Sequence, residues 1–315
     1  MVELSYPWLS FTAISTYVSC PRRFQYKYVN FFDEMETPFM IRGRIVHEIF
    51  EEFFDELTIT KVMASLKRHK MDQRIEKTIT YNMFLNLLHA LLDRKLMIPE
   101  DSEEWALINR MMMSFSRMQV QRLYVLRAQA GALTREIVRD HWFPMEKERF
   151  YMDHDNKIYG KIDAVWRNFD GTYDIVDYKT GSPGKKDRKP RPAETLQARL
   201  YTRMFCTEEE IDPARTRFHF VYTSVPASKL PRIITINYNK SAEKKILNKV
   251  QRIRDRIDAG IFNRVIDFHP LTDKPVNETR IPFFYKRVCG YCSYTYHCHG
   301  IEPDEFRSWM DNKIY

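Results

Sequence analysis

Apolar residues recur at helical spacing through the first part of the chain, as at Ile45, Ile49, Phe53 and Leu57. The surrounding stretch, from Arg44 to Ala130, holds no glycine and a single proline. Because glycine and proline are the residues that interrupt helices, this stretch is predicted to be mostly helical. Asp101 followed by Glu104 predicts the start of its last helix, over 105–129.

After Gly131 the pattern changes, because runs of β-branched and aromatic residues predict strands. The predicted strands are 134–141, 148–153, 158–167, 172–178, 217–224 and 232–238, and helices are predicted over 193–205 and 242–259. This order indicates an α/β core, with a mixed sheet flanked by helices and a helical insertion. It divides the chain into an N-terminal segment 1–40, a helical region 41–133, a core 134–262 and a C-terminal segment 263–315.

Composition excludes several classes of protein. The 315 residues are 44% hydrophobic and 29% charged, which is typical of a globular chain and not of a disordered one. No run approaches the roughly 18 apolar residues of a membrane helix, and residues 1–10 do not resemble a signal peptide, so we expect an intracellular, cytoplasmic protein without a membrane partner. The net charge of +8 permits a polyanionic partner.

Two aspartates and a lysine are predicted to converge on neighbouring strands. Asp177 and Lys179 are two residues apart and therefore share a face of their strand. If residues 169–171 form a three-residue hairpin loop with Gly171 in the left-handed position, the numbers of paired residues sum to 340, and Asp163 lies opposite Asp177. A two-residue loop would shift the sum to 341 and separate them.

Such a group of residues suits metal-assisted hydrolysis of a phosphodiester. Carboxylate oxygens are preferred ligands of Mg²⁺ and Mn²⁺, and the bound metal polarises the phosphate and lowers the pKa of a water molecule. The lysine would orient or help to deprotonate that water, or offset the charge that develops in the transition state. Ordinary solvated charges on a surface hairpin are the alternative, but both aspartates lie in apolar strand sequence, where unpaired charges are rare.

Four of the five cysteines form a second candidate site. Cys289, Cys292 and Cys298 lie within ten residues near the C-terminus, and Cys20 lies near the N-terminus. Four thiolates suit an iron–sulfur cluster or tetrahedral zinc, and the spacing alone does not separate the two. Cys206, in an apolar helical stretch, is interpreted as a buried small hydrophobe.

The sequence resembles the PD-(D/E)XK nuclease superfamily, and within it the RecB-like branch that carries an iron–sulfur cluster. That branch includes the AddB nuclease domain, the CRISPR-associated RecB-like exonucleases and the exonuclease V type. The resemblance depends on four motifs in the family's order: Gly43-x-x-x-His47, Gly160-x-Ile162-Asp163, Asp177-Tyr178-Lys179 and Gln197-x-x-x-Tyr201. It also covers Cys20-Pro21 and the C-terminal cysteines.

The resemblance implies a role for each of these residues. His47, Asp163 and Asp177 would bind the Mg²⁺ or Mn²⁺ ion, and Lys179 would position the attacking water. Gln197 and Tyr201 would organise the active site or hold the scissile phosphate. Glu148, on the preceding predicted strand, is a further acidic candidate. The cofactor held by Cys20, Cys289, Cys292 and Cys298 would be a 4Fe-4S cluster that fastens the two ends of the chain together.

The resulting expectation is a metal-dependent DNA nuclease, a single-strand or end-dependent exonuclease in recombination, repair or phage or CRISPR DNA processing. A helicase or a recombination or CRISPR protein would be its partner. The basic loop before the Gln-x-x-x-Tyr helix contains Lys185, Lys186 and Arg188. These residues are candidate nucleic-acid contacts or ordinary solvated charges. Two competing hypotheses are a non-catalytic nucleic-acid-binding or assembly subunit with the same fold, and a nuclease stapled by zinc.

Overall fold

The computed structural model describes residues 8–34, 36–67, 74–96, 99, 102–182, 184, 189–301, 305, 306 and 308. It divides into two compact units. One comprises residues 1–36, 152–160 and 240–315, and the other comprises residues 37–151 and 161–239. Among the described residues, no helix combines the length and the apolar character needed to cross a membrane.

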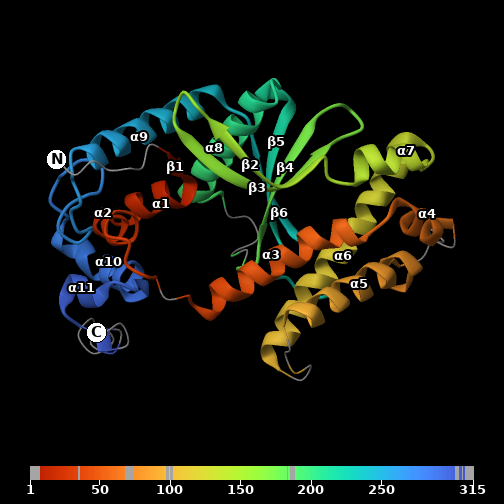
Figure 1. Ribbon diagram of the computed structural model, residues 1–315, viewed down its shortest axis with the longest axis horizontal. Coiled ribbons are helices and arrows are strands. Elements are labelled where there is room, and N and C mark those ends of the chain that lie inside the picture. Colours follow the sequence, from red (N-terminus) through yellow and green to blue (C-terminus); the bar gives the residue numbers. More distant parts are fainter. Residues whose placement is uncertain are drawn as a thin grey trace. The chain divides into compact units, whose positions relative to one another are not determined.

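The larger unit, residues 37–151 and 161–239, contains a mixed sheet (Figure 1). Its strands are most of β2 (Glu146–Asp153) and of β3 (Ile158–Arg167), and all of β4 (Tyr173–Lys179), β5 (Thr216–Tyr222) and β6 (Arg232–Asn237). They are ordered β3-β4-β5-β6, with β2 also paired to β3. The β4–β5 pair is parallel, whereas β3–β4 and β5–β6 are antiparallel. This confirms the predicted α/β fold with a mixed sheet flanked by helices.

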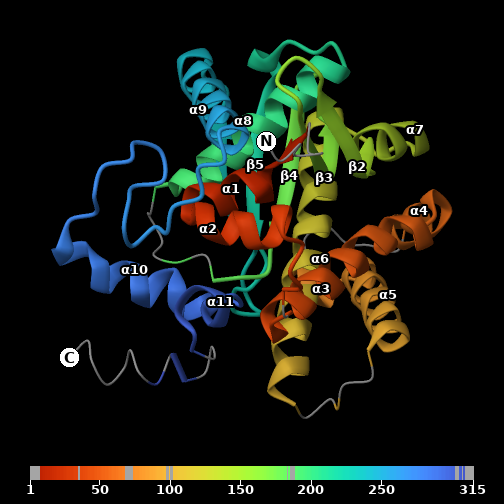
Figure 2. The same ribbon diagram turned by 60° about the vertical axis from the view of Figure 1, so that its left-hand side comes forward.

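Helices cover both faces of this sheet. Those before it are α3 (Pro38–Glu56), α4 (Ile59–Lys67), α5 (Ile79–Lys95), α6 (Glu103–Ala130) and the short α7 (Arg135–Ile137), and α8 (Pro192–Glu208) connects β4 to β5. Figures 1 and 2 show α3, α5 and α6 side by side. Their apolar faces share one core with Trp166, Val176 and Tyr178 of the sheet. The helix α8 packs against β5, where Tyr201 contacts Phe218.

Two details of the predicted elements change. The N-cap of α6 is Ser102, whose side chain accepts a hydrogen bond from the Trp105 amide, while Asp101 lies outside the described residues. The predicted strand 134–141 is wrong: it forms α7 and a π-helix, Val138–Trp142. Val138 and Trp142 are four residues apart and both fully buried, so a helical face, which presents both to the core, replaces the alternation of a strand.

The smaller unit holds both ends of the chain. Its elements are β1 (Leu9–Ser10), α1 (Phe11–Ser19), α2 (Pro21–Phe24), a π-helix (Gln25–Val29), α9 (Lys240–Asp258), α10 (Ile281–Arg287) and α11 (Thr295–His299). β1 pairs in parallel with the first residues of β3, which belong to this unit. The Tyr17 hydroxyl of α1 donates a hydrogen bond to the carbonyl of Ile261, after α9. The N-terminal and C-terminal segments therefore pack together within one unit.

Candidate active site and cysteine cluster

The hairpin between β3 and β4 brings Asp163 close to Asp177. Ala164 pairs with Val176 and Arg167 pairs with Tyr173, so paired numbers sum to 340 as predicted. Gly171 has a φ of +76°, the left-handed conformation that a three-residue loop favours at its last position. Asp163 is the residue before Ala164 on β3, and its Oδ2 accepts a hydrogen bond from the backbone amide of Tyr178 on β4, across 2.7 Å. The predicted register is therefore confirmed.

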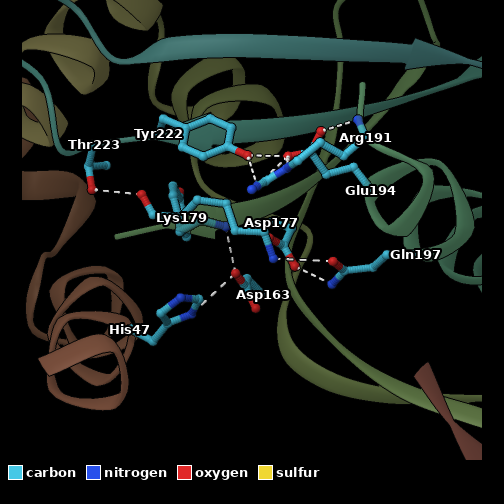
Figure 3. Close-up of polar contacts among 10 residues, drawn as sticks. His47, Asp163, Asp177, Lys179, Arg191, Glu194, Gln197, Tyr222 and Thr223 are labelled. Carbon is cyan, nitrogen blue, oxygen red and sulfur yellow. Dashed lines mark hydrogen bonds and ion pairs between the residues drawn. The ribbon is translucent and has the colours of Figure 1, made fainter. Parts of the chain in front are cut away.

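His47 approaches Asp163 from helix α3. Its Nδ1 lies 3.2 Å from Oδ2 of Asp163, and Figure 3 shows the ring pointing at that carboxylate. Gly43, one turn earlier on α3, lies beside Thr180 at the end of β4, because a Cβ built on it would lie 3.4 Å from Oγ1 of Thr180. The Gly-x-x-x-His segment of α3 therefore packs next to the strand that carries Asp177 and Lys179.

Glu148 completes a group of three possible metal ligands. One ligand atom from each of His47, Glu148 and Asp163 lies within 4.8 Å of the other two. Glu148 has a φ of +48° in strand β2, a conformation that costs a residue other than glycine about 1–3 kcal/mol. Strain of this kind is concentrated at functional sites, where the surrounding structure maintains it. The Glu148 carboxylate also contacts Lys161, with 2.5 Å between Oε2 and Nζ.

Asp177 is engaged differently. Its Oδ2 lies 2.7 Å from the Lys179 ammonium, and its Oδ1 accepts a hydrogen bond from the Gln197 side-chain amide across 2.5 Å. The Lys179 ammonium donates in turn to the Gln197 carbonyl oxygen across 3.2 Å. Figure 3 shows this triangle on the other side of Asp163 from His47. In the structure Gln197 therefore holds Asp177 and Lys179 in place, and its amide has both of its ends engaged.

Tyr201 follows Gln197 by one turn of α8 and is buried. Burial, and then the charges of Asp177 and Asp163, raise the pKa of the Tyr201 phenol. The hydroxyl therefore stays protonated and lies within the electrostatic field of the carboxylates. Lys185, Lys186 and Arg188, the candidate nucleic-acid contacts, lie outside the described residues.

Negative charge dominates this group. Burial lowers the pKa of His47, but the Asp163 carboxylate, with smaller contributions from Asp177 and Glu148, outweighs it and raises the pKa to about 9. Burial and the Asp163 charge together raise the pKa of Glu148. The protein thus draws a proton onto an imidazole to balance its carboxylates. That is the behaviour expected of a site whose donor atoms, carboxylate oxygens and an imidazole nitrogen, fit a divalent cation such as Mn²⁺ or Mg²⁺.

The four cysteines predicted to act together line one small cavity in the smaller unit, of about 20 Å³. Cys20 caps the start of α2, Cys289 and Cys292 flank a 3₁₀ turn, and Cys298 lies in α11. Burial, and then the other three thiolates, raise the pKa of the Cys289 thiol. A thiol whose ionisation is opposed by burial and by neighbouring thiolates fits a positively charged centre, which would stabilise the thiolates. Cys206 is buried in α8, as predicted.

Comparison with known proteins gives one family match. The sequence model of the PD-(D/E)XK nuclease superfamily matches residues 8–299. No curated protein matches the chain. Among solved structures, a protein from Eubacterium rectale named as a candidate exonuclease is 12% identical, covering 82% of this chain and 84% of its own, with a TM-score of 0.43. A protein called SSO0001 is 15% identical, covering 83% of this chain and 97% of its own, with a TM-score of 0.29.

Proposed function

The chain belongs to the PD-(D/E)XK nuclease superfamily, and on that premise we propose that it hydrolyses phosphodiester bonds of DNA with a divalent cation. The observation that carries the proposal is the position of Asp163. One oxygen of its carboxylate meets His47, and the same hairpin places the Asp177–Lys179 ion pair beside it. A possible metal site and a lysine are thereby brought together on two adjacent strands.

His47, Glu148 and Asp163 would hold the cation, with Asp177 at its edge. This set differs from the one expected from the sequence, because Glu148 joins the group of three in which Asp177 is absent. A bound Mg²⁺ or Mn²⁺ ion would polarise the phosphate and lower the pKa of a water molecule. The imidazole would shift preference towards Mn²⁺, compared with a site made of oxygen ligands alone.

Lys179 would act as a hydrogen-bond donor and a fixed positive charge. Burial lowers the pKa of the Lys179 ammonium, but the Asp177 charge and hydrogen bond outweigh it, and the net pKa is raised. As an ammonium it would orient the attacking water and stabilise the negative charge that accumulates on the phosphate. The raised pKa supports this role over that of a base that deprotonates the water.

Gln197 would position these groups, and Tyr201 would add a protonated hydroxyl near the carboxylates. Because both ends of the Gln197 amide are engaged by Asp177 and Lys179, its role is to fix their geometry. Side chains of this kind act through the residues that they orient.

Three finer expectations stay predictions from the resemblance. They are the preference for single strands or free ends, the helicase or recombination partner, and a role in recombination, repair or phage or CRISPR DNA processing.

Cleavage of linear and circular single-stranded DNA would test the proposal. We expect the wild-type protein to cut linear DNA with Mn²⁺ or Mg²⁺ and not with EDTA, and Lys179→Ala to lose this activity. Lys147→Ala, in strand β2 of the same sheet, is the matched control and should retain it. Sparing of the circle would assign an end-dependent exonuclease. No cleavage by folded, metal-binding protein would contradict the proposal and favour a non-catalytic binding subunit.

We also propose that Cys20, Cys289, Cys292 and Cys298 hold a 4Fe-4S cluster. The four cysteines line a single cavity, which supports one shared centre for all four thiolates. The choice of a 4Fe-4S cluster over zinc comes from the resemblance to the iron–sulfur branch of the family. Metal analysis of anaerobically purified protein should find iron with visible absorbance; stoichiometric zinc without iron would refute the cluster.

A further inference from the structure

A second cavity lies on the face of the sheet opposite Asp177 and Lys179. It has a volume of about 420 Å³ and is lined by residues of helix α6 and of strands β4, β5 and β6. Asp174 of β4 lines this cavity. Successive residues of a strand point to opposite faces, so Asp174, three residues before Asp177, points to the face opposite that of Asp177. A smaller cavity of about 160 Å³ adjoins it, and Arg122 and Ile233 line both. The combined space is in the range of small-molecule sites, about 300–1,000 Å³.

One part of the cavity wall is apolar and exposed. Val125, Phe169, Leu230 and Ile233 all line it, and each exposes between 44% and 50% of its surface. These four are among the large hydrophobic residues that the described part of the chain leaves in contact with water, and they gather at one place. A contiguous apolar patch in a concavity marks a binding site more often than a single exposed residue does.

Arg122 supplies a positive charge beside this apolar part of the cavity wall. Its guanidinium carbon lies 4.0 Å from the centroid of the Trp166 ring, and one N–H group donates to Oε1 of Gln119 across 3.2 Å. Within the described ranges no carboxylate forms an ion pair with it, although a guanidinium has five N–H donors. Burial lowers the pKa of Arg122 to about 10, and the Asp174 charge opposes this shift. The Arg122 side chain is half-buried at the cavity wall, where a guanidinium without an ion pair can bind an anionic group.

The neighbouring arginine on α6 shows the usual arrangement. Arg117 is buried, pairs with Glu76 at 2.7 Å and donates to the carbonyl oxygens of Ala227 and Lys229. These bonds hold the loop before β6 against α6 and so place Leu230 in the wall of the cavity. One arginine of the helix therefore builds the wall, and the other, Arg122, presents its donors to the space that the wall encloses.

The acidic groups of the cavity are already engaged. Asp174 accepts a hydrogen bond from Nε of Arg217 across 2.8 Å and lies 3.1 Å from Nε2 of His219. Asp170 accepts hydrogen bonds from the amide and hydroxyl of Thr172. Of the two arginines that line the cavity, Arg122 is the one that forms no ion pair within the described residues, although the Asp174 charge acts on it. A ligand complementary to this space therefore has an apolar body and one anionic group.

We propose that this cavity binds a small amphiphilic anion, whose carboxylate or phosphate pairs with Arg122 and whose aliphatic or aromatic body fills the space between Val125, Leu230 and Ile233. This site is separate from the proposed nuclease centre and does not depend on its activity. The planar guanidinium can bind an anionic head through two parallel hydrogen bonds, and Trp166 holds that plane in position.

The probe for this site is 8-anilinonaphthalene-1-sulfonate, a fluorescent aromatic anion. We expect saturable binding to the wild-type protein at one site, weakened at least about tenfold in Arg122→Gln, as for the loss of a charge-assisted hydrogen bond. Arg127→Gln, on the same helix and exposed, is the matched control and should bind as the wild type does. Equal affinity in Arg122→Gln and the wild type, or no saturable binding, would overturn the proposal.

A second pair of variants keeps the test decisive if Arg122→Gln does not fold. Ile233→Glu places a carboxylate at an exposed position of the cavity and should abolish probe binding, whereas Ile79→Glu, an equally exposed position on α5, should not. Decanoate should displace the probe and inorganic phosphate should not. Displacement by phosphate and not by decanoate would contradict the proposed apolar body of the ligand. Displacement by a DNA oligonucleotide and not by decanoate would overturn it and assign the cavity to nucleic acid.

Discussion

The Gln197 side chain donates a hydrogen bond to Asp177 across 2.5 Å and, through its other end, accepts one from Lys179. A residue on α8 thereby fixes the separation of two groups on β4 (Figure 3). Asp177 is a buried carboxylate, and burial followed by the neighbouring Asp163 charge raises its pKa, which the Lys179 charge opposes. The position of the lysine and the ionisation of the aspartate are therefore linked through one amide.

Replacing Gln197 with methionine keeps the length of the side chain and removes both hydrogen bonds. We expect the cleavage rate to fall roughly 10–100-fold, the effect typical of a partner that orients catalytic or ligating groups. The rate constant under saturating DNA and metal measures this. Gln251→Met, on α9 and exposed, removes a comparable hydrogen bond, to Asp255, and should leave the rate unchanged. An unaltered rate in folded Gln197→Met protein would show that the amide positions nothing essential.

Glu148 is expected to contribute to metal affinity. Glu148→Gln should weaken Mn²⁺ binding by at least the roughly 10–100-fold that outer-shell partners of a metal contribute. Calorimetric titration of the protein with Mn²⁺ measures the affinity directly, without DNA. The control is Glu146→Gln, two residues earlier on β2, where the carboxylate pairs with Arg149. If both variants bind Mn²⁺ equally well, the strained conformation of Glu148 has another cause.

Asp174 should contribute stability that disappears in acid. Burial raises its pKa, but the hydrogen bonds and charges of His219 and Arg217 outweigh it and lower the pKa to about 2. A carboxyl whose folded-state pKa is depressed stabilises the protein above its unfolded-state pKa of about 3.9, by about 2.6 kcal/mol here, and loses this as the pH falls towards 2.

Asp174→Asn should therefore destabilise the protein at pH 7, and the difference from the wild type should shrink between pH 4 and pH 3. Urea unfolding at pH 7, 4 and 3 measures it. Asp170→Asn is the control for the loss of a carboxylate in the same hairpin, because Asp170 is exposed and bonded within its own loop. If the difference in unfolding free energy between the two proteins stays constant down to pH 3, the ionisation of Asp174 is not its cause.

Cys20 should be required for the iron centre although it lies 269 residues before Cys289 in the chain. Cys20→Ala, purified anaerobically, is expected to lose iron and visible absorbance, because one of the four thiolates around the cavity is then missing. Cys206→Ala removes another buried cysteine, in α8, and should keep both. Iron retained in full by Cys20→Ala would separate the N-terminal cysteine from the centre.

Local sequence was sufficient for the elements whose conformation is set by near neighbours. The position of Gly171 in a three-residue loop, together with the alternation of β3 and β4, decided the register that brings Asp163 towards Asp177. Turn geometry and side-chain alternation act over a few residues, and both are readable in one dimension. The same reasoning failed for 134–141, because burial of Val138 and Trp142 against distant helices overrode the strand preference of that segment.

The make-up of the two sites was decided by the tertiary structure. Periodicity does not show that Glu148 takes a left-handed conformation and joins His47 and Asp163, nor that Gln197 spans Asp177 and Lys179. Nor does it show that Arg122 lines a cavity and forms no ion pair within the described part of the chain, while Arg117, on the same helix, pairs with Glu76. These relationships join residues that are distant in the chain, and their energies depend on burial and on the charges brought near, which exist only once the helices have packed on the sheet.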